Sequence, residues 1–264
     1  MRGKVISKDD TAIAFDQSGQ GPVVILVGGA LGDRSASEPL AALVAEHFTV
    51  LNYDRRGRGE SGDTLPYAVE REIEDIDALI KEGGGSAFVL GGSSGAVLAL
   101  EASARGLAIK KLALYEPPFI IDESRPPLPK DYVTQLNEMI AAGQRGDAVA
   151  FFMTKAVGMP AEAIVPMRQT PFWPRLSAAA HTLAYDGTIM GKTMSGHPLP
   201  RGKWDSVTIP TLVMDGGASP AWMRNAVQAL VDVLPCAQRC TLEDQTHVVS
   251  PEALAPILIA FFNG

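Results

Sequence analysis

Residues 88–96 form an apolar run that passes directly into a turn of small residues, in the order Phe-Val-Leu-Gly-Gly-Ser-Ser-Gly-Ala. The first three residues continue a strand-like apolar run, and residues 97–105 have the composition of a helix. A strand that enters a helix through so short a connection must cross it closely, and Gly91 and Gly95 leave room for that crossing. The segment therefore predicts a sharp strand-to-helix turn with Ser93 at its tip.

A serine at the tip of such a turn is a candidate nucleophile. The Gly-x-Ser-x-Gly spacing around Ser93 exposes its hydroxyl, and the N-terminus of the following helix offers amide groups to a developing anion. Ser94 also has small residues two positions before and after it, so the pattern can be centred on either serine. Ser93 is favoured because the strand pattern ends just before it. A glycine-rich connection without chemistry has the same local sequence.

Composition and charge exclude several classes of protein. The 264 residues carry a formal net charge of −7, and no basic stripe with interleaved aromatic residues is present, so nucleic acid is not an expected partner. The longest apolar runs have the length of strands, and the N-terminal residues do not resemble a signal peptide. We expect a cytoplasmic monomer or homodimer that does not bind membranes and acts on a small molecule. Cys236 and Cys240 lack nearby histidines for a zinc site and are expected to be reduced thiols.

Strand and helix patterns alternate through residues 1–116 and again through residues 206–264. The expected strands are nearly continuous apolar runs, which predicts an α/β fold with one mostly parallel sheet covered by helices on both faces. Ligands of such sheets bind beyond the carboxyl ends of the strands. The expected strands are 5–7, 11–16, 23–27, 49–53, 88–90, 111–115, 210–214 and 238–242, and the expected helices are 37–46, 69–82, 97–105, 221–234 and 251–262.

Residues 117–205 have a different character. They show no strand pattern, and prolines separate helical stretches at 132–142, 147–157 and 175–183. We expect this segment to be a helical insertion into a single core made of the two flanking parts. It holds six of the nine methionines, together with Phe172 and Trp173. Such side chains can line an apolar pocket, although for any one of them filling the segment's own interior is the more common role.

A serine nucleophile needs a base, which in most such sites is a histidine oriented by a carboxylate. The chain has four histidines, His47, His181, His197 and His247. His247 lies in the loop between the last expected strand and the last expected helix, at the edge where the ligand site of a parallel sheet forms. The other three lie at the end of an early helix or in the insertion. His247 is therefore the predicted base.

Five segments, taken in their order along the chain, resemble the α/β-hydrolase superfamily. They are the run Val27-Gly28-Gly29-Ala30-Leu31-Gly32, the segment from Asp54 to Ser61, the turn around Ser93, the run Ile209-Pro210-Thr211-Leu212-Val213, and His247. The resemblance covers nearly the whole chain apart from the insertion. It implies an eight-stranded, mostly parallel sheet, a helical cap inserted after the sixth strand, and catalytic groups in the order serine, acid, histidine.

The resemblance also implies an oxyanion hole formed by the backbone amides of Ala30 and Ser94. Many relatives have His-Gly where this chain has Gly28-Gly29, a change of side chain that need not remove an amide. The segment from Asp54 to Ser61 resembles a structural loop of the family. Its charges are expected to hold loops together rather than to take part in the chemistry.

The usual acid of the superfamily is missing from this chain. Relatives commonly have Gly-x-x-Asp after the strand that ends near Met214, whereas Ser219 occupies the position of that aspartate. A serine cannot supply the negative charge that stabilises an imidazolium. Glu116 directly follows the expected strand 111–115, where some haloalkane dehalogenases of this fold place their acid, and Asp215 ends the usual acid-bearing strand. Glu116 is the favoured acid and Asp215 the alternative.

A serine nucleophile favours an acyl-enzyme route. We expect hydrolysis of a carboxylic ester or lactone with a small to medium apolar acyl part, without a cofactor or a metal. Dehalogenases and epoxide hydrolases of this fold need an aspartate in place of Ser93. The same residues are compatible with a cofactor-free haloperoxidase or perhydrolase, a carbon–carbon bond hydrolase or a lyase. The serine at position 219 is also compatible with a non-catalytic ligand-binding member of the fold.

Overall fold

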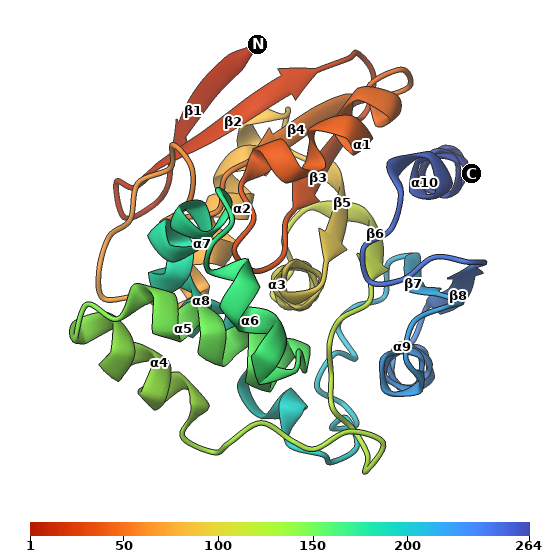
Figure 1. Cartoon of the computed structure of the whole chain (residues 1–264). Helices are drawn as coiled ribbons and strands as arrows, with labels where there is room; N and C mark the ends of the chain where they lie inside the picture. Colours follow the sequence, from red (N-terminus) through yellow and green to blue (C-terminus); the bar gives the residue numbers. More distant parts are fainter.

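An eight-stranded sheet forms the centre of the computed structural model, which describes all 264 residues (Figure 1). The strand order is β1-β2-β4-β3-β5-β6-β7-β8. β1 and β2 are antiparallel, β2 is antiparallel to β4, and all other neighbours are parallel, so the predicted mostly parallel sheet is confirmed. The strands are β1 (Arg2–Ile6), β2 (Ala12–Ser18), β3 (Val23–Val27), β4 (Thr49–Tyr53), β5 (Ala87–Gly92), β6 (Ile109–Tyr115), β7 (Thr211–Gly216) and β8 (Ala237–Leu242).

Helices cover both faces of this sheet, and alternate residues of each central strand face different apolar cores. In β3, Ile25 and Val27 belong to one core and Val24 and Leu26 to the other. A parallel strand covered on both faces is apolar at every position, which explains the continuous run at residues 23–27. The first core contains α2 (Val69–Glu82), α3 (Ser94–Ala104) and α9 (Ala221–Val233), and the second contains α1 (Glu38–Val44) and α10 (Pro251–Asn263).

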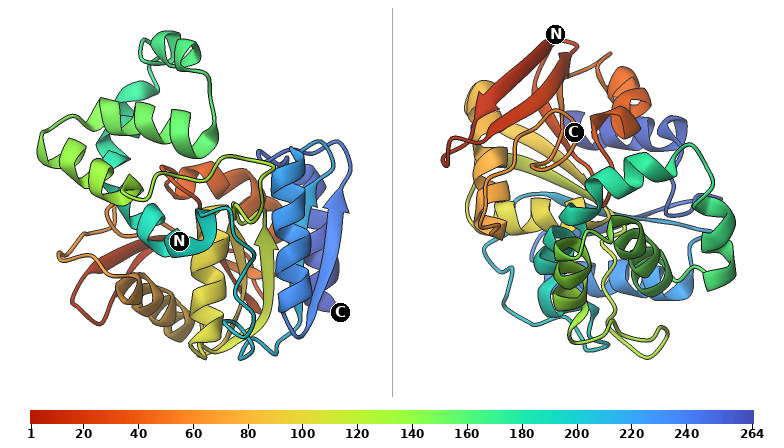
Figure 2. Two further views of the ribbon diagram at one scale, coloured as in Figure 1. Left: turned by 90° about the horizontal axis from the view of Figure 1, so that it is seen from below. Right: turned by 60° about the vertical axis from the view of Figure 1, so that its left-hand side comes forward.

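Between β6 and β7 the chain forms helices and loops without a strand. Residues 117–205 are here called the helical segment. Its ends pack into the first core through residues such as Phe119, Ile189 and Trp204, whereas the middle of the segment projects beside the core (Figure 2). Its apolar cluster includes Leu136, Val149 and Trp173, together with Leu31 from the loop that follows β3. Its elements are α4 (Tyr132–Ala141), α5 (Arg145–Phe152), η2 (Met153–Val157), α6 (Ala161–Met167), α7 (Trp173–Ala179), η3 (Ala180–Thr182), α8 (Leu183–Met190) and η4 (Gly191–Met194).

Two helices of this segment, α6 and α8, have no counterpart among the expected helices. α6 contains Pro166, which reads as a helix breaker in the sequence. α8 is buried over most of its residues and contains Gly187, so it lacks the polar stripe by which a surface helix is recognised. The expected helix at 175–183 is in fact divided, because α7 ends at Ala179 and α8 begins at Leu183.

The loop after β4 carries arginines that are buried and paired with carboxylates. Arg56 donates from Nε and Nη2 to Asp75, at 2.8 and 2.7 Å, and from Nη1 to Asp9 at 2.9 Å. Arg55 donates from Nε and Nη2 to Glu72, at 2.7 and 2.8 Å. Both Asp75 and Glu72 lie on α2, so the arginines tie this loop to the helix layer. This is the structural role expected for the charges of residues 54–61.

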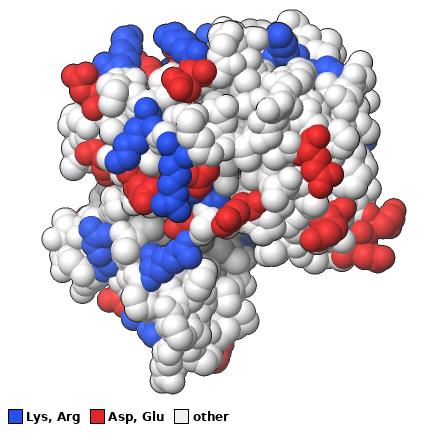
Figure 3. All heavy atoms as spheres, turned by 90° about the horizontal axis from the view of Figure 1, so that it is seen from above, with Lys and Arg blue, Asp and Glu red and all other residues white.

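The surface charge is mixed in sign. On the face shown in Figure 3, lysine and arginine side chains lie beside aspartate and glutamate in several places, and wide areas between them carry no charge. None of the helices combines the length and the apolar character that crossing a membrane requires.

Replacing Arg56 by alanine should lower the free energy of unfolding by about 3–5 kcal/mol, because Asp75 is left as an unpaired carboxylate in the interior. Urea denaturation followed by circular dichroism measures this change. The matched control is Lys81→Ala, which removes an exposed ion pair with Asp77 on the same helix, α2, and should change the stability little. Equal losses in the two variants would contradict a structural role for the buried arginine.

Candidate active site

Ser93 lies between β5 and α3 in a strained backbone conformation. Its φ of 55° and ψ of −127° are rare for a residue with a side chain. A Cβ atom on Gly91 would lie 2.5 Å from the carbonyl oxygen of Gly95, and one on Gly95 would lie 2.3 Å from that of Val27. Neither position can accept a side chain, as the close crossing of strand and helix requires. The turn presents Ser93 to a cavity beyond the end of the sheet.

Glu116 and His247 come from different loops and form a hydrogen-bonded pair beside this cavity. His247 Nδ1 lies 2.8 Å from Glu116 Oε2, and Glu116 Oε1 accepts a hydrogen bond of 2.8 Å from the amide of Gly216. The Glu116 side chain is fully buried, whereas that of His247 is 40% exposed. A carboxylate at Nδ1 favours the tautomer protonated there, so Nε2 is left free to accept a proton.

The loop that carries His247 is fastened to the end of the sheet. Tyr115 Oη donates a hydrogen bond of 2.5 Å to the carbonyl oxygen of Thr246. The amide of Ala218 donates to the carbonyl oxygen of Gln245 at 2.9 Å. Gln245 and Thr246, the two residues directly before His247, are therefore each hydrogen-bonded to a residue outside their own loop. These contacts limit the positions that the imidazole can take.

Asp215, the alternative acid, is turned toward β8. Its Oδ2 lies 2.5 Å from Arg239 Nη2, and its Oδ1 accepts a hydrogen bond of 2.7 Å from Thr241 Oγ1. It makes no hydrogen bond to His247. Ser219, at the family's usual acid position, is buried, and its hydroxyl has no partner. The structure thus brings Glu116, and not Asp215, to the histidine.

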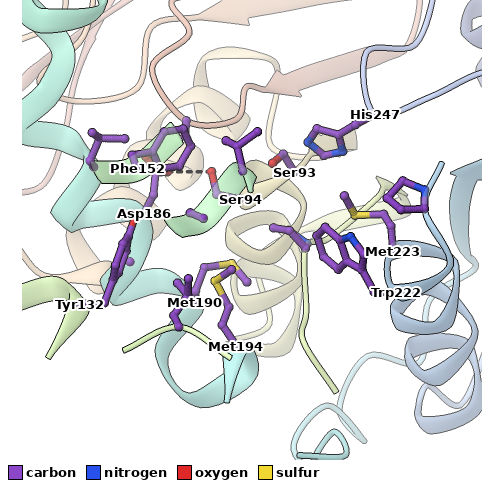
Figure 4. A pocket seen from close by; sticks show the side chains of 18 residues that line it. Ser93, Ser94, Tyr132, Phe152, Asp186, Met190, Met194, Trp222, Met223 and His247 are labelled. Atoms are coloured by element: carbon purple, nitrogen blue, oxygen red, sulfur yellow. Dashed lines mark hydrogen bonds between the residues drawn. The ribbon is translucent and has the colours of Figure 1, made fainter. Parts of the chain in front are cut away.

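Ser93 and His247 both open into an apolar cavity of about 210 Å³ between the helical segment and the core (Figure 4). Ala30 and Ser94, the predicted sources of the oxyanion amides, line the same cavity. The amide of Ala30 donates no hydrogen bond within the protein. Ser94 is the first residue of α3, where helix amides have no intrahelical acceptor. Both amides therefore lack a backbone acceptor, which is compatible with their predicted role, and that role stays a prediction.

The other walls of the cavity are mostly apolar. The larger side chains that line it are Tyr132, Phe152, Met190, Met194, Trp222 and Met223. Of the six methionines in the helical segment, Met190 and Met194 line the cavity, and the other four pack against the segment's own apolar cluster. Trp173 is buried in that cluster and Phe172 is exposed, so neither lines the cavity.

Several other candidate residues lie elsewhere or have other partners. His47 and His197 are exposed, and His181 lies 3.6 Å from Asp63. None of these three histidines lines the cavity of Ser93.

The hydroxyl of Ser94, the other serine of the turn, donates a hydrogen bond of 2.7 Å to Asp186 Oδ1. Asp186 lies on α8 and lines the cavity, and the sequence patterns did not single it out.

This combination of strand order, serine turn and late histidine has clear parallels among known proteins. A family model described as "Alpha/beta hydrolase family" matches residues 23–257. The chain belongs to this family. A solved structure of an alpha/beta hydrolase from Sphaerobacter thermophilus DSM 20745 is 56% identical and has a TM-score of 0.91, over 98% of this chain and 100% of that one.

More distant proteins share the fold or part of the sequence. The enol-lactonase from Burkholderia xenovorans LB400 is 20% identical with a TM-score of 0.74, over 99% of this chain and 100% of that one, which shows the fold alone. The uncharacterized hydrolase YraK from Bacillus subtilis (strain 168) is 37% identical over 93 residues, 34% of each chain. The matched region thus spans about a third of that curated relative. These similarities agree with a hydrolase and confirm the predicted family.

The proton on His247 Nδ1 should give a strongly downfield ¹H NMR resonance, because it lies in a hydrogen bond to a buried carboxylate. Glu116→Gln should move this resonance upfield, since an amide oxygen is a weaker acceptor than a carboxylate. Asp215→Asn is the matched control and should leave the resonance in place. A signal that moves with Asp215→Asn instead would contradict the pairing of Glu116 with His247.

Proposed function

We propose that this α/β hydrolase cleaves a carboxylic ester or lactone through an acyl-enzyme on Ser93. The observation that carries the proposal is the hydrogen-bonded pair of His247 and Glu116 at the cavity into which Ser93 projects. Acyl transfer needs a nucleophile, an oriented base and donors for a developing oxyanion at one place. Ser93, this pair, and the amides of Ala30 and Ser94 are a complete set of such groups.

In the proposed reaction, Ser93 Oγ attacks the carbonyl carbon while His247 Nε2 takes the hydroxyl proton. The amides of Ala30 and Ser94 stabilise the oxyanion, and Glu116 stabilises the imidazolium through Nδ1. The imidazolium then gives its proton to the leaving alcohol oxygen, and the acyl group remains on Oγ. A water molecule, deprotonated by Nε2, attacks this ester, and the acid leaves as Ser93 regains its proton. No hydrogen bond joins Ser93 Oγ to Nε2 in the structure, and in ligand-free enzymes this contact often tightens only with substrate.

The cavity favours an uncharged acyl group of small to medium size. Its walls are mostly apolar, and its carboxylate, Asp186, is paired with Arg55 and Arg58. No unpaired cation faces the cavity to bind an anionic acyl group. Burial of apolar acyl carbons against these walls supplies the binding energy in this proposal.

Two other classes of function use the same fold. A perhydrolase, a haloperoxidase or a carbon–carbon bond hydrolase would need the same nucleophile and base, so activity on graded substrates distinguishes them. A non-catalytic binding protein was suggested by Ser219 at the usual acid position. The contact between Glu116 and His247 argues against it, because Glu116 supplies the charge that Ser219 lacks.

Ser93 should react with a fluorophosphonate probe in the folded protein, and peptide mass spectrometry should locate the label on Ser93. The label should be absent from Ser93→Ala. A series of p-nitrophenyl esters and lactones of graded chain length should show turnover that depends on acyl size, because the cavity limits the acyl part. A folded protein without labelling at Ser93 would contradict the hydrolase proposal.

Glu116→Gln should lower kcat by about 10²- to 10⁴-fold, because the imidazolium loses its carboxylate partner. Asp215→Asn should change kcat little, since Asp215 faces Arg239 and Thr241. Steady-state kinetics on the best ester of the series measures both, with thermal unfolding to verify that each variant is folded. The opposite ranking would assign the acid to Asp215.

A further inference from the structure

Helix α8 presents one face to the cavity of Ser93. Leu183, Asp186, Gly187 and Met190 line the cavity, and their spacing of three, four and seven residues places them on one side of the helix. Asp186 is the charged residue of this face, and its side chain is 6% exposed. A carboxylate buried in an otherwise apolar face needs partners that offset the cost of its burial.

The partners of Asp186 all belong to the core, not to the helical segment. Oδ1 accepts hydrogen bonds from Ser94 Oγ at 2.7 Å and from Arg55 Nη1 at 2.8 Å, and Oδ2 accepts one from Arg58 Nη2 at 2.7 Å. Burial acts to raise the pKa of Asp186, but the positive charges of Arg58 and Arg55 outweigh it, so the pKa lies below its ordinary value. The carboxylate is therefore ionised at neutral pH. Figure 4 shows its hydrogen bond to Ser94 at the cavity wall.

The same arginines also hold the loop that follows β3. Arg58 Nη1 donates a hydrogen bond to the carbonyl oxygen of Gly29, and Arg55 Nη1 lies 3.2 Å from that of Gly28. The carbonyl of Gly29 and the amide of Ala30 belong to one planar trans peptide, in which C=O and N–H point in opposite directions. Fixing the oxygen on Arg58 therefore fixes the direction of the Ala30 N–H.

We infer that Asp186 is a positioning residue for the oxyanion hole: it holds Ser94 directly and orients the peptide between Gly29 and Ala30 through Arg58. The inference rests on the proposed acyl transfer by Ser93. Asp186 acts through these neighbours and exchanges no proton or bond with the substrate. Through it, a helix of the helical segment takes part in setting the two donors that stabilise the oxyanion.

The test compares Ser94→Ala and Asp186→Asn with the matched control Tyr185→Phe. Ser94→Ala keeps the backbone amide and removes only the hydroxyl that binds Asp186. Tyr185→Phe removes a different hydrogen bond from the neighbouring position of α8, that of Tyr185 Oη to Asp63 Oδ2 at 2.7 Å. It therefore loosens the contact between α8 and the core without touching the partners of the oxyanion donors.

Ser94→Ala should lower kcat by about 10-fold, less than the 10²- to 10³-fold loss for removal of a whole donor, because the amide stays but is less well held. KM should change little, since the oxyanion interaction is made in the transition state. Asp186→Asn should lower kcat at least as much, because Arg58 also loses its charged partner. Tyr185→Phe should leave kcat within about 2-fold of the wild type, the result expected where no transition-state contact is altered.

A second readout is the rate at which a fluorophosphonate probe reacts with Ser93, because this reaction also develops charge on an oxygen in the oxyanion hole. It should slow in Ser94→Ala and Asp186→Asn and stay unchanged in Tyr185→Phe, with circular dichroism and thermal unfolding reported for all three. The inference would be overturned if folded Ser94→Ala had the same kcat and labelling rate as the wild type. It would also be overturned if kcat and the labelling rate fell equally in Ser94→Ala and in Tyr185→Phe. A wild-type protein that is labelled at Ser93 but hydrolyses no ester or lactone would contradict the proposed substrate class, and the labelling rates would still test the inference.

Discussion

The close crossing of β5 and α3 at Ser93 is the constraint on which the rest of the candidate site depends. It needs glycine at both flanking positions and a strained serine between them, and it sets the serine at the end of a central strand. β5 lies between β3 and β6 in the sheet, so the loops that follow these two strands begin on either side of Ser93. One of them carries Ala30 and the other begins at Glu116. The strand order of the sheet thus determines which residues can lie next to Ser93.

The carboxylate that pairs with His247 illustrates how one fold can place the same charge from different strands. In this chain the carboxylate comes from the end of β6, the neighbour of the serine strand, and it is buried and fixed by the amide of Gly216. Asp215 at the end of β7 is paired with Arg239 and Thr241 on β8 and makes no hydrogen bond to the histidine. Ser219 supplies no charge at the usual position, and its buried hydroxyl has no partner.

The sequence predicted those features of the fold and the candidate site that depend on local patterns. Continuous apolar runs predicted the parallel strands. Ser93, Glu116 and His247 were predicted as site residues because each follows the end of an expected strand. Asp186 could not be found in this way. Its helix, α8, is buried on nearly every side and has no polar stripe. Its partners Arg55 and Ser94 lie 131 and 92 residues away, so no nearby residue in the sequence indicates what the carboxylate binds.

The buried charges beneath the loop after β3 are better explained by orientation than by stability. Arg55 and Arg58 are balanced by Glu72 and Asp186, and replacing such buried ion pairs with apolar side chains is often neutral or stabilising, because desolvation cancels much of the attraction. An apolar replacement, however, could not hold a carbonyl oxygen or a serine hydroxyl in one direction. The geometric demand of an oxyanion hole is directional, since its donors must already point at the place where charge develops. A charged cluster that holds Gly29 and Ser94 meets that demand, and because Asp186 lies on α8, the wall of the cavity and the direction of the donors are set by the same helix.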